Sequence, residues 1–261
     1  MARPISPPAE GCAWVTGASS GIGRETALAL AREGWTVAVS ARSEDKLADL
    51  AREMEGLPGR GVVAPCDVTD ADAVRQAVDR IEAEAGPIDL AILNAGIYEP
   101  DRFEDLDAAK FAKTVEVNLI GTVTCLAALK DRWLARRRGH AAIVSSVAGY
   151  RGLPRSLSYG ATKAALTNFC EALKFDFDRL GLKIQVIHPG FVRTPATEVN
   201  DFRMPALMEP EDAARAIVEG LATNAFEITF PKRFTYALKA LRILPYGAYF
   251  ALLKRQTGPR R

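Results

Sequence analysis

Short runs of β-branched and other apolar residues alternate along this chain with longer segments whose apolar positions recur every three or four residues. The first pattern is typical of buried strands and the second of amphipathic helices. Their alternation predicts an α/β fold, with helices on both faces of a doubly wound parallel sheet of about seven strands. The expected strands are Cys12 to Thr16, Thr36 to Ser40, Gly61 to Cys66, Asp89 to Leu93, Ala141 to Ser145, Lys183 to His188 and Phe226 to Phe230. Helices are expected to begin near Ile22, Glu44, Ala71, Asp107, Ser156 and Pro210.

The length of 261 residues suits a single domain of this kind, which we place at residues 11–231. Residues 1–10 hold three prolines and no apolar run long enough for a signal peptide, so we expect a flexible lead and a cytoplasmic protein. Residues 232–261 form a C-terminal extension. Hydrophobic residues make up 48% of the chain and charged residues 25%, the balance of an ordinary folded protein.

Metal chemistry has little support in the sequence. The four cysteines stand far apart in apolar surroundings, and the chain has only two histidines. This spacing is unlike that of a zinc site or a secreted disulfide scaffold. We therefore expect no metal, and four buried free thiols at Cys12, Cys66, Cys125 and Cys170.

The C-terminal extension is basic and aromatic. Residues 231–261 contain eight Lys or Arg and no acidic residue, whereas the whole chain carries a net charge of +2, so the remainder is acidic. Such a stretch can lie in a membrane interface and admit lipid-like substrates, or its apolar face can pack on the domain or on a partner subunit. Pro245 and Gly247 interrupt it too much for a spanning helix.

One connection between expected elements is long. Gly190 to Glu209 lies between a strand and a helix, past the carboxyl end of the strand. Ligands bind at the carboxyl ends of the strands in open parallel sheets. The segment is therefore either a lid over a ligand site or an ordinary surface loop.

A glycine-rich segment, Thr16 to Gly23, joins the first expected strand to the first helix. Glycines allow a tight turn there and let a pyrophosphate approach backbone N–H groups at the helix start. The segment predicts a Rossmann-like dinucleotide site in which the cofactor contacts Gly17, Ser19, Ser20, Gly21, Ile22 and Gly23.

Residues after later strands extend this site. Asp67, followed by Val68, comes after the third strand and either accepts a hydrogen bond from adenine or caps the following helix. Asn94, Ala95 and Gly96 follow the fourth strand and offer small residues where backbone passes a ribose. Both segments fall on the expected ligand edge of the sheet.

The end of the second expected strand reads Ala41-Arg42. An NAD-selective site usually places a carboxylate here, on the ribose 2′-hydroxyl. Ala41 removes the repulsion that a carboxylate would impose on a 2′-phosphate, and Arg42 either binds that phosphate or is simply solvated. We therefore expect NADP(H) as the cofactor.

Tyr159 and Lys163 are four residues apart on an expected helix, so their side chains share one face. A nearby ammonium stabilises a phenolate and would lower the Tyr159 pKa from its usual value of about 10. The pair predicts proton transfer at Tyr159, with Lys163 adjusting its pKa.

The order of these motifs along residues 11 to about 230 resembles the short-chain dehydrogenase/reductase family. Besides the glycine turn and Asn94-Ala95-Gly96, the resemblance includes Asn118, Ser145-Ser146, Tyr159-Gly160-Ala161-Thr162-Lys163 and Pro189-Gly190.

This resemblance implies roles for individual residues. Tyr159 would exchange a proton with the substrate oxygen, while Ser146 hydrogen-bonds that oxygen. Lys163 would contact the nicotinamide ribose, and Asn118 would hold a water that links the lysine to solvent. The segment flanking the nicotinamide would consist of Pro189, Gly190 and Thr194.

We therefore expect an NADP(H)-dependent carbonyl reductase or alcohol dehydrogenase, of class EC 1.1.1.-, that acts on an apolar or lipid-like ketone or aldehyde. Tyr98, Tyr150 and Phe191 are candidates for the substrate pocket. The alternatives are a non-catalytic NADP(H)-sensing or scaffold protein and a membrane-peripheral protein. The resemblance also implies a homodimer, since the extension would obstruct a second interface at the last strand, and no nucleic-acid partner is expected.

Overall fold

The computed structural model describes residues 11–202 and 204–257, so the expected lead at residues 1–10 lies outside the described residues. Seven strands form one sheet in the order β3-β2-β1-β4-β5-β6-β7, and every neighbouring pair is parallel. The order reverses between β1 and β4, the position at which open parallel sheets bind ligands. The strands are β1 (Cys12–Thr16), β2 (Thr36–Ser40), β3 (Arg60–Val63), β4 (Ile88–Leu93), β5 (His140–Val144), β6 (Lys183–Pro189) and β7 (Glu227–Phe230).

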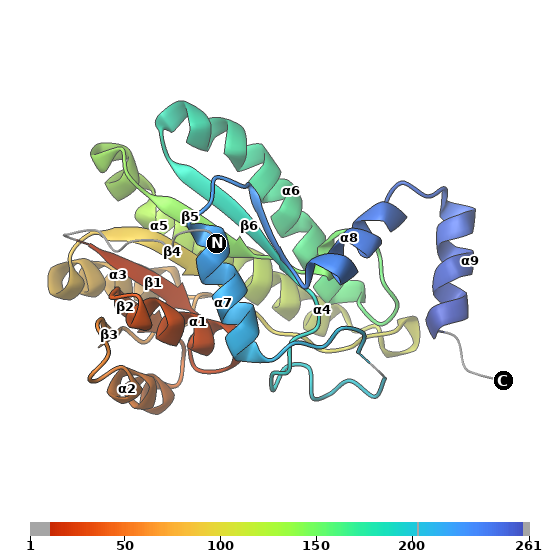
Figure 1. Cartoon of the computed structure of the whole chain (residues 1–261), viewed down its shortest axis with the longest axis horizontal. Helices are drawn as coiled ribbons and strands as arrows, with labels where there is room; N and C mark the ends of the chain where they lie inside the picture. The colour runs from red at the N-terminus through yellow and green to blue at the C-terminus, as the bar shows by residue number, and fades with distance from the viewer. Residues whose placement is uncertain (1–10, 203, 258–261) are drawn as a thin grey trace.

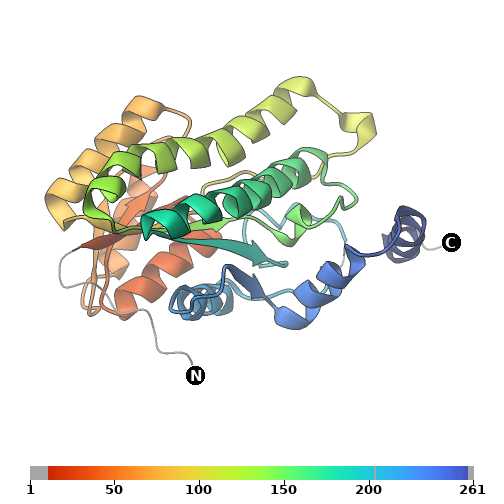
Figure 2. The same ribbon diagram turned by 90° about the horizontal axis from the view of Figure 1, so that it is seen from above.

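Helices cover both faces of this sheet (Figures 1 and 2), which confirms the predicted architecture. One face carries α1 (Gly21–Arg32), α2 (Glu44–Glu53) and α7 (Pro210–Leu221). The other carries α3 (Ala71–Ala85), α4 (Ala108–Val115), α5 (Gly121–Arg136) and α6 (Leu157–Leu180). Short helical turns are η1 (Phe103–Asp105), η2 (Glu116–Ile120) and η3 (Val147–Gly149), and the extension forms α8 (Lys232–Leu241) and α9 (Tyr246–Thr257).

The strand bounds follow the apolar runs closely. β1 and β2 have the predicted bounds, and all six residues of β4 are buried, as expected for a sheet covered on both faces. The prediction was wrong at β3, which ends at Val63 and not at Cys66. Pro65 lacks the N–H that a strand ladder needs, so the chain leaves the sheet before it.

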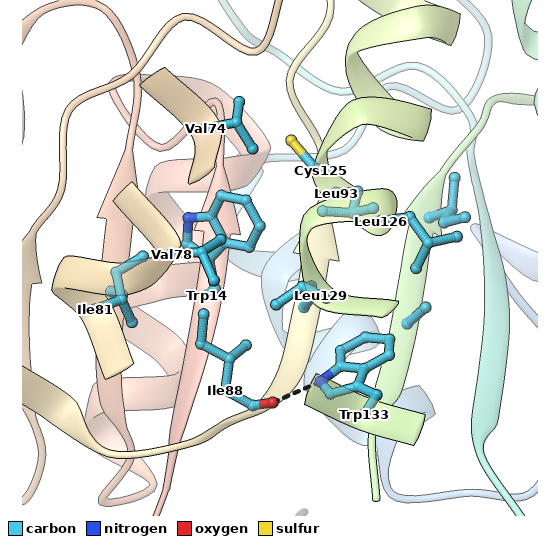
Figure 3. Close-up of a cluster of buried hydrophobic side chains, with 14 of the residues drawn as sticks. Trp14, Val74, Val78, Ile81, Ile88, Leu93, Cys125, Leu126, Leu129 and Trp133 are labelled. Carbon is cyan, nitrogen blue, oxygen red and sulfur yellow. Dashed lines mark hydrogen bonds between the residues drawn. The ribbon is translucent and has the colours of Figure 1, made fainter. Parts of the chain in front are cut away.

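The larger of two apolar cores lies between the sheet and helices α3, α5 and α6 (Figure 3). Two buried tryptophans anchor it, and each keeps a hydrogen bond for its indole N–H. Trp133 donates to the Ile88 carbonyl oxygen at 2.7 Å, and Trp14 donates to Ser40 Oγ at 2.8 Å. Burial therefore costs these side chains no hydrogen bond. All four cysteines are buried and free, as predicted.

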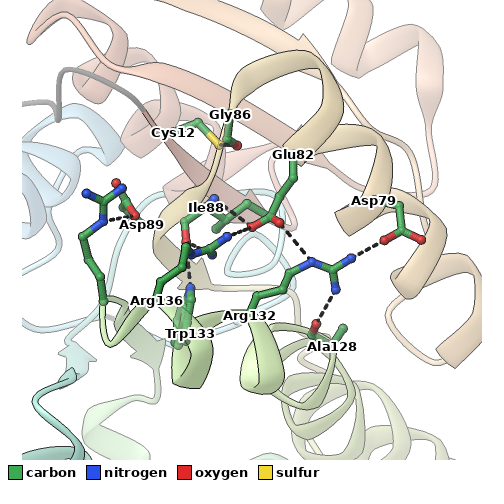
Figure 4. Close-up of polar contacts among 11 residues, drawn as sticks. Cys12, Asp79, Glu82, Gly86, Ile88, Asp89, Ala128, Arg132, Trp133 and Arg136 are labelled. Atoms are coloured by element: carbon green, nitrogen blue, oxygen red, sulfur yellow. Dashed lines mark hydrogen bonds and ion pairs between the residues drawn. The ribbon is translucent and has the colours of Figure 1, made fainter.

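A charged cluster joins α3 to α5 (Figure 4). Glu82 accepts hydrogen bonds from Arg132 Nε at 3.0 Å and from the Ile88 backbone N–H at 3.1 Å, and it pairs with Arg136 at 2.9 Å. Arg132 also pairs with Asp79. Because the Glu82 side chain is only 19% exposed, these partners compensate its desolvation and fix the turn before β4 against α5.

Within the described ranges, one helical stretch, Ala108–Arg136, is long and apolar enough by composition to cross a membrane. Its α5 portion packs Cys125, Leu126, Leu129 and Trp133 into the core beside β4. One face of the stretch therefore belongs to the folded core.

Candidate active site

A cavity of about 640 Å³ lies along the carboxyl ends of the strands. This volume lies in the range usual for pockets that bind small molecules. Loops after β1, β2, β3, β4, β5 and β6 line it. The structure thus brings nearly all the predicted site residues to one cavity. In residues 11–202 and 204–257, no group of three His, Cys, Asp or Glu side chains could hold a metal ion.

The turn between β1 and α1 needs its glycines. Gly17 and Gly21 have φ values of +67° and +56°, in the left-handed region that favours glycine. A Cβ on Gly17 would lie 2.8 Å from the Ala95 Cα, and one on Gly23 would lie 2.4 Å from the Gly17 carbonyl oxygen. Gly23 lies behind the cavity wall, where its lack of a side chain lets Asn94 approach the turn.

Hydrogen bonds lock this turn to the end of β4. Thr16 Oγ1 accepts from the backbone N–H groups of Asn94 at 3.0 Å and Ala95 at 3.1 Å. Asn94 Nδ2 donates to the carbonyl oxygens of Thr16 at 3.1 Å and Gly17 at 3.2 Å. Ser20, the N-cap residue of α1, makes no side-chain cap hydrogen bond and lines the cavity. The start of α1 therefore opens on the cavity, where it favours an anionic group such as a pyrophosphate.

Cations gather at the β2 end of the cavity. Arg42 is exposed and lines the cavity, together with Ser43, Lys46 and Lys113. Lys46 was not among the predicted site residues, although it lies four residues after Arg42 at the start of a predicted helix. The excess of positive charge suits a phosphate group.

Asp67 also lines the cavity and, as a carboxylate, carries a negative charge. Its Oδ1 accepts from the backbone N–H of Thr69 at 2.9 Å and from Thr69 Oγ1 at 2.8 Å. Burial acts to raise the Asp67 pKa, but these bonds and the charges of Arg42 and Lys113 outweigh it and lower the pKa. The N-cap of α3 is Asp70, so the alternative that Asp67 caps this helix is wrong.

α6 places Tyr159 and Lys163 one turn apart on the cavity wall. Lys163 Nζ lies 5.5 Å from the centre of the Tyr159 ring and donates to the Val144 carbonyl oxygen at 2.7 Å. Ser146 follows β5 and also lines the cavity. Its neighbour Ser145 donates to the Lys163 carbonyl oxygen at 2.8 Å, so this hydroxyl supports the helix.

Burial shifts the pKa values of both α6 groups. It raises the pKa of Tyr159 to about 12, with Tyr98 adding to the rise and Ser146 opposing it. It lowers the pKa of Lys163, which is 3% exposed, to about 8. Desolvation dominates at the phenol and the Lys163 amine donates to the Val144 carbonyl oxygen, so the lowering of the Tyr159 pKa by Lys163 stays a prediction. Tyr159 is therefore a neutral phenol at pH 7, the form that can donate a proton.

Asn118 lies in the π turn η2, a distortion that is frequent at functional sites. It is fully buried and does not line the cavity. Its Oδ1 accepts from the Ile97 N–H at 2.7 Å, and its Nδ2 donates to the Ile97 carbonyl oxygen at 3.0 Å and to Thr162 Oγ1 at 3.2 Å. Asn118 thus ties the segment after β4 to the helix that carries Tyr159.

The long connection after β6 covers the cavity. Pro189, Gly190, Phe191 and Thr194 line it, and a Cβ on Gly21 would lie 2.9 Å from the Thr194 methyl group. Further along, Asn200 Oδ1 accepts from the Tyr98 hydroxyl at 2.8 Å. These contacts support the lid interpretation over that of a surface loop, and we call residues 190–202 and 204–209 the lid.

The substrate end of the cavity is mostly apolar. Tyr98 and Phe191 line it as expected, but Tyr150 does not. The Tyr150 hydroxyl instead donates to Glu227 at 2.6 Å and contacts Thr229 at 3.1 Å, under β7. Further apolar lining residues were not predicted, because loops far apart in the sequence contribute them: Ile97, Val147, Leu153, Pro154 and Phe202.

Comparisons with known proteins identify the family to which the chain belongs. Residues 11–203 match the family model of short chain dehydrogenases. The chain is 35% identical over 243 residues to an oxidoreductase of Myxococcus xanthus, covering 93% of this chain and 96% of that protein. It is 32% identical over 184 residues to the 3-oxoacyl-acyl-carrier-protein reductase of Thermotoga maritima, covering 70% of this chain and 75% of that protein.

Solved structures extend the comparison. An alcohol dehydrogenase from Thermococcus sibiricus complexed with 5-hydroxy-NADP matches with a TM-score of 0.76 and 27% identity, covering 85% of this chain and 96% of that one. A 3-oxoacyl-acyl-carrier-protein reductase from Brucella melitensis with bound NAD matches with a TM-score of 0.75 and 27% identity, covering 88% and 90%. The chain belongs to the short-chain dehydrogenase/reductase family, a family of oxidoreductases that use nicotinamide cofactors.

Proposed function

We propose that this oxidoreductase interconverts a neutral, apolar ketone or aldehyde and its alcohol with NADP(H), as a carbonyl reductase or alcohol dehydrogenase of class EC 1.1.1.-. One observation carries the proposal. Ser146, Tyr159 and Lys163 lie together on the wall of a cavity that has a glycine turn at one end and an apolar pocket at the other.

The residues present fit a dinucleotide phosphate. The glycine turn and the start of α1 would hold the pyrophosphate, and Asp67 and Val68 would lie along the adenine. Arg42 and Lys46 would pair with the 2′-phosphate, which supports NADP(H) over NAD(H). The small Asn94 to Gly96 segment and Lys163 would contact ribose, and Pro189, Gly190 and Thr194 would flank the nicotinamide. When bound, the nicotinamide would supply the hydride for reduction or accept it in the reverse direction.

The chain's own residues would handle the proton. The neutral Tyr159 hydroxyl donates its proton to the carbonyl oxygen as negative charge develops there, and Ser146 Oγ hydrogen-bonds the same oxygen. The Lys163 pKa of about 8 means that this amine is largely charged at neutral pH and stabilises the phenolate left behind. Proton transfer of this kind contributes about 10²- to 10⁴-fold in rate.

The charge distribution of the cavity supports a neutral substrate. Among the described residues, the charged side chains on its lining are Arg42, Lys46, Asp67, Lys113 and Lys163. All but Lys163 stand at the end proposed for the adenine half of the cofactor. Lys163 is buried and already donates to the Val144 carbonyl oxygen. A carboxylate or phosphate on the substrate would therefore find no exposed cation on the described lining of the substrate end.

We further propose that the protein is a cytoplasmic homodimer. Exposed apolar side chains on η2 and α5 support a seam that includes these helices and α6: Ile120, Val123 and Leu134. α8 follows β7 directly and packs on it, which supports a dimer over a tetramer. Light scattering is expected to give the mass of a dimer, and a stable tetramer would contradict this part of the proposal.

A panel of steroids, 3-oxoacyl esters, long-chain ketones and sugars, followed by NADPH and NADH absorbance, tests the proposed reaction. We expect NADPH oxidation with neutral apolar ketones and slower oxidation of NADH. Tight NADPH binding without turnover of any carbonyl would instead favour a non-catalytic NADP(H)-sensing or scaffold protein.

A further inference from the structure

The extension presents apolar side chains to solvent at one end of the molecule, where α8 packs beside β7 and α9 stands away from the sheet (Figures 1 and 2). Tyr236 is 54% exposed, Ile243 85%, Tyr246 71% and Phe250 51%. We call these four residues the tail surface. The Tyr246 and Phe250 rings stack with 5.9 Å between their centroids.

Contacts with the loop before α6 hold these helices in place. Arg151 donates to the carbonyl oxygens of Leu241 at 2.9 Å and Leu244 at 2.8 Å, and its guanidinium lies 4.1 Å from the centre of the Tyr249 ring. The Tyr249 hydroxyl donates to the Gly152 carbonyl oxygen at 2.7 Å. Because α9 is anchored through Tyr249, its Tyr246 and Phe250 side chains are held outward.

The charged residues of the two extension helices are all basic. Residues 231–257 contain no Asp or Glu. Of their six cations, Lys239 pairs with Glu227 of β7, whereas Lys254 and Arg255 at the end of α9 are exposed. The full set is Lys232, Arg233, Lys239, Arg242, Lys254 and Arg255.

We propose that the tail surface docks on the anionic surface of a lipid bilayer. Aromatic side chains are favoured at the level of the lipid headgroups, and neighbouring Lys and Arg gain from anionic lipids. A second copy of this chain fits the surface less well. A twofold interface would place the tail surface against itself and bring two sets of cations together.

The tail surface is connected to the apolar end of the cavity. Phe234 of α8 lies 5.8 Å, centroid to centroid, from Phe191 on the cavity wall. Arg151 and Gly152, which hold α8 and α9, directly precede Leu153 and Pro154 on the same wall. Docking would thus bring the substrate end close to lipid, and this consequence, unlike docking itself, rests on the proposed function.

Co-sedimentation of the full chain with vesicles of phosphatidylcholine, with and without phosphatidylserine, tests the docking. We expect binding to the phosphatidylserine vesicles that weakens as salt is added. Lys254→Gln with Arg255→Gln should lower the partition coefficient about five-fold for each cation removed. Tyr246→Ser with Phe250→Ser should lower it as well. Arg75→Gln with Arg80→Gln on α3 is the matched control for the loss of two cations, because both side chains are exposed outside the extension, and binding should not change.

Each opposite result overturns the proposal. The proposal fails if wild-type protein does not co-sediment with phosphatidylserine vesicles. It also fails if the Tyr246→Ser, Phe250→Ser variant binds these vesicles as tightly as wild type. If light scattering gives a smaller oligomer for that variant than for wild type while vesicle binding is unchanged, the tail surface binds a second copy of the chain instead. Circular dichroism checks that each variant is folded. None of these readouts needs turnover, so failure here leaves the proposed reaction standing.

Discussion

The ring of Tyr98 lies edge to face against the ring of Tyr159, with 4.9 Å between their centroids. The Tyr98 hydroxyl donates to Asn200 in the lid at 2.8 Å. Tyr98 therefore contacts both the proposed proton donor and the lid.

Asn200→Ala removes the acceptor for the Tyr98 hydroxyl and loosens the lid. We expect the KM for the carbonyl substrate to rise by up to about ten-fold, the worth of one hydrogen bond, with the KM for NADPH unchanged. Steady-state kinetics measure both constants. Asn224→Ala, an exposed asparagine after α7, should behave like wild type. An unchanged substrate KM in Asn200→Ala would contradict the role of this contact.

Cofactor preference should depend on the two cations at the β2 end of the cavity. Replacing Arg42 or Lys46 by Ala removes a charge-assisted partner of the 2′-phosphate, so we expect the KM for NADPH to rise about 10- to 100-fold with little effect on NADH. Arg52→Ala, on the exposed side of α2 and paired with Asp49, is the control. Equal effects on the two cofactors would mean that neither cation contacts the phosphate.

Substitutions of the two adjacent serines should have different effects, one on catalysis and the other on stability. Ser146→Ala removes the proposed hydrogen bond to the substrate oxygen and should lower kcat about 10²- to 10³-fold, as for loss of an oxyanion donor. Ser145→Ala removes a buried bond to the Lys163 carbonyl oxygen and should mainly lower the free energy of unfolding, by about 1 kcal/mol. Steady-state kinetics and urea unfolding of both variants test the assignment. A large fall in kcat for Ser145→Ala, with only a loss of stability for Ser146→Ala, would mean that Ser145 is the residue that binds the substrate oxygen.

Glu227 makes stability depend on pH. It accepts from the Tyr150 hydroxyl, lies 2.8 Å from His188 Nδ1 and forms an ion pair with Lys239. Burial opposes its ionisation, but these partners dominate and lower its pKa from 4.5 to about 2. A carboxylate with a lowered folded-state pKa stabilises the fold above pH 4.5, and this contribution is lost as pH falls toward 2.

Glu227→Gln should therefore lower the free energy of unfolding by about 3 kcal/mol at pH 7, and by less below pH 4.5. Urea unfolding over this pH range measures the difference, with exposed Glu219→Gln on α7 as control. If the free energies of unfolding of wild type and Glu227→Gln differ by the same amount down to pH 2, the charge of Glu227 is not the cause of the stability difference.

The sheet was predictable because both its faces are buried, so each strand is an apolar run between turn residues. The glycine turn was predictable for a related reason: Gly17 and Gly21 need positive φ, and Gly23 leaves no room for a Cβ. Such constraints act within a few residues, so they are visible in the sequence.

What the sequence could not show depends on three-dimensional contacts. The rise of the Tyr159 pKa comes from desolvation by loops that are distant in sequence. Tyr150 was misassigned because its direction is set by Glu227 and Thr229 on β7, almost eighty residues away. For the extension, the fold shows that Tyr249 and Leu253 are buried while Tyr246 and Phe250 are exposed, a division that composition alone left open.

Single-turnover reduction by Tyr159→Phe, with any carbonyl that the wild type accepts, tests the central claim most directly. The variant keeps the ring against Tyr98 and lacks only the hydroxyl, so NADPH binding followed by fluorescence titration should match wild type. We predict that its rate of NADPH oxidation falls at least about 10²-fold, the lower bound for loss of a proton donor. A rate close to that of wild type, with NADPH bound normally, would contradict the assignment of Tyr159 as the proton donor.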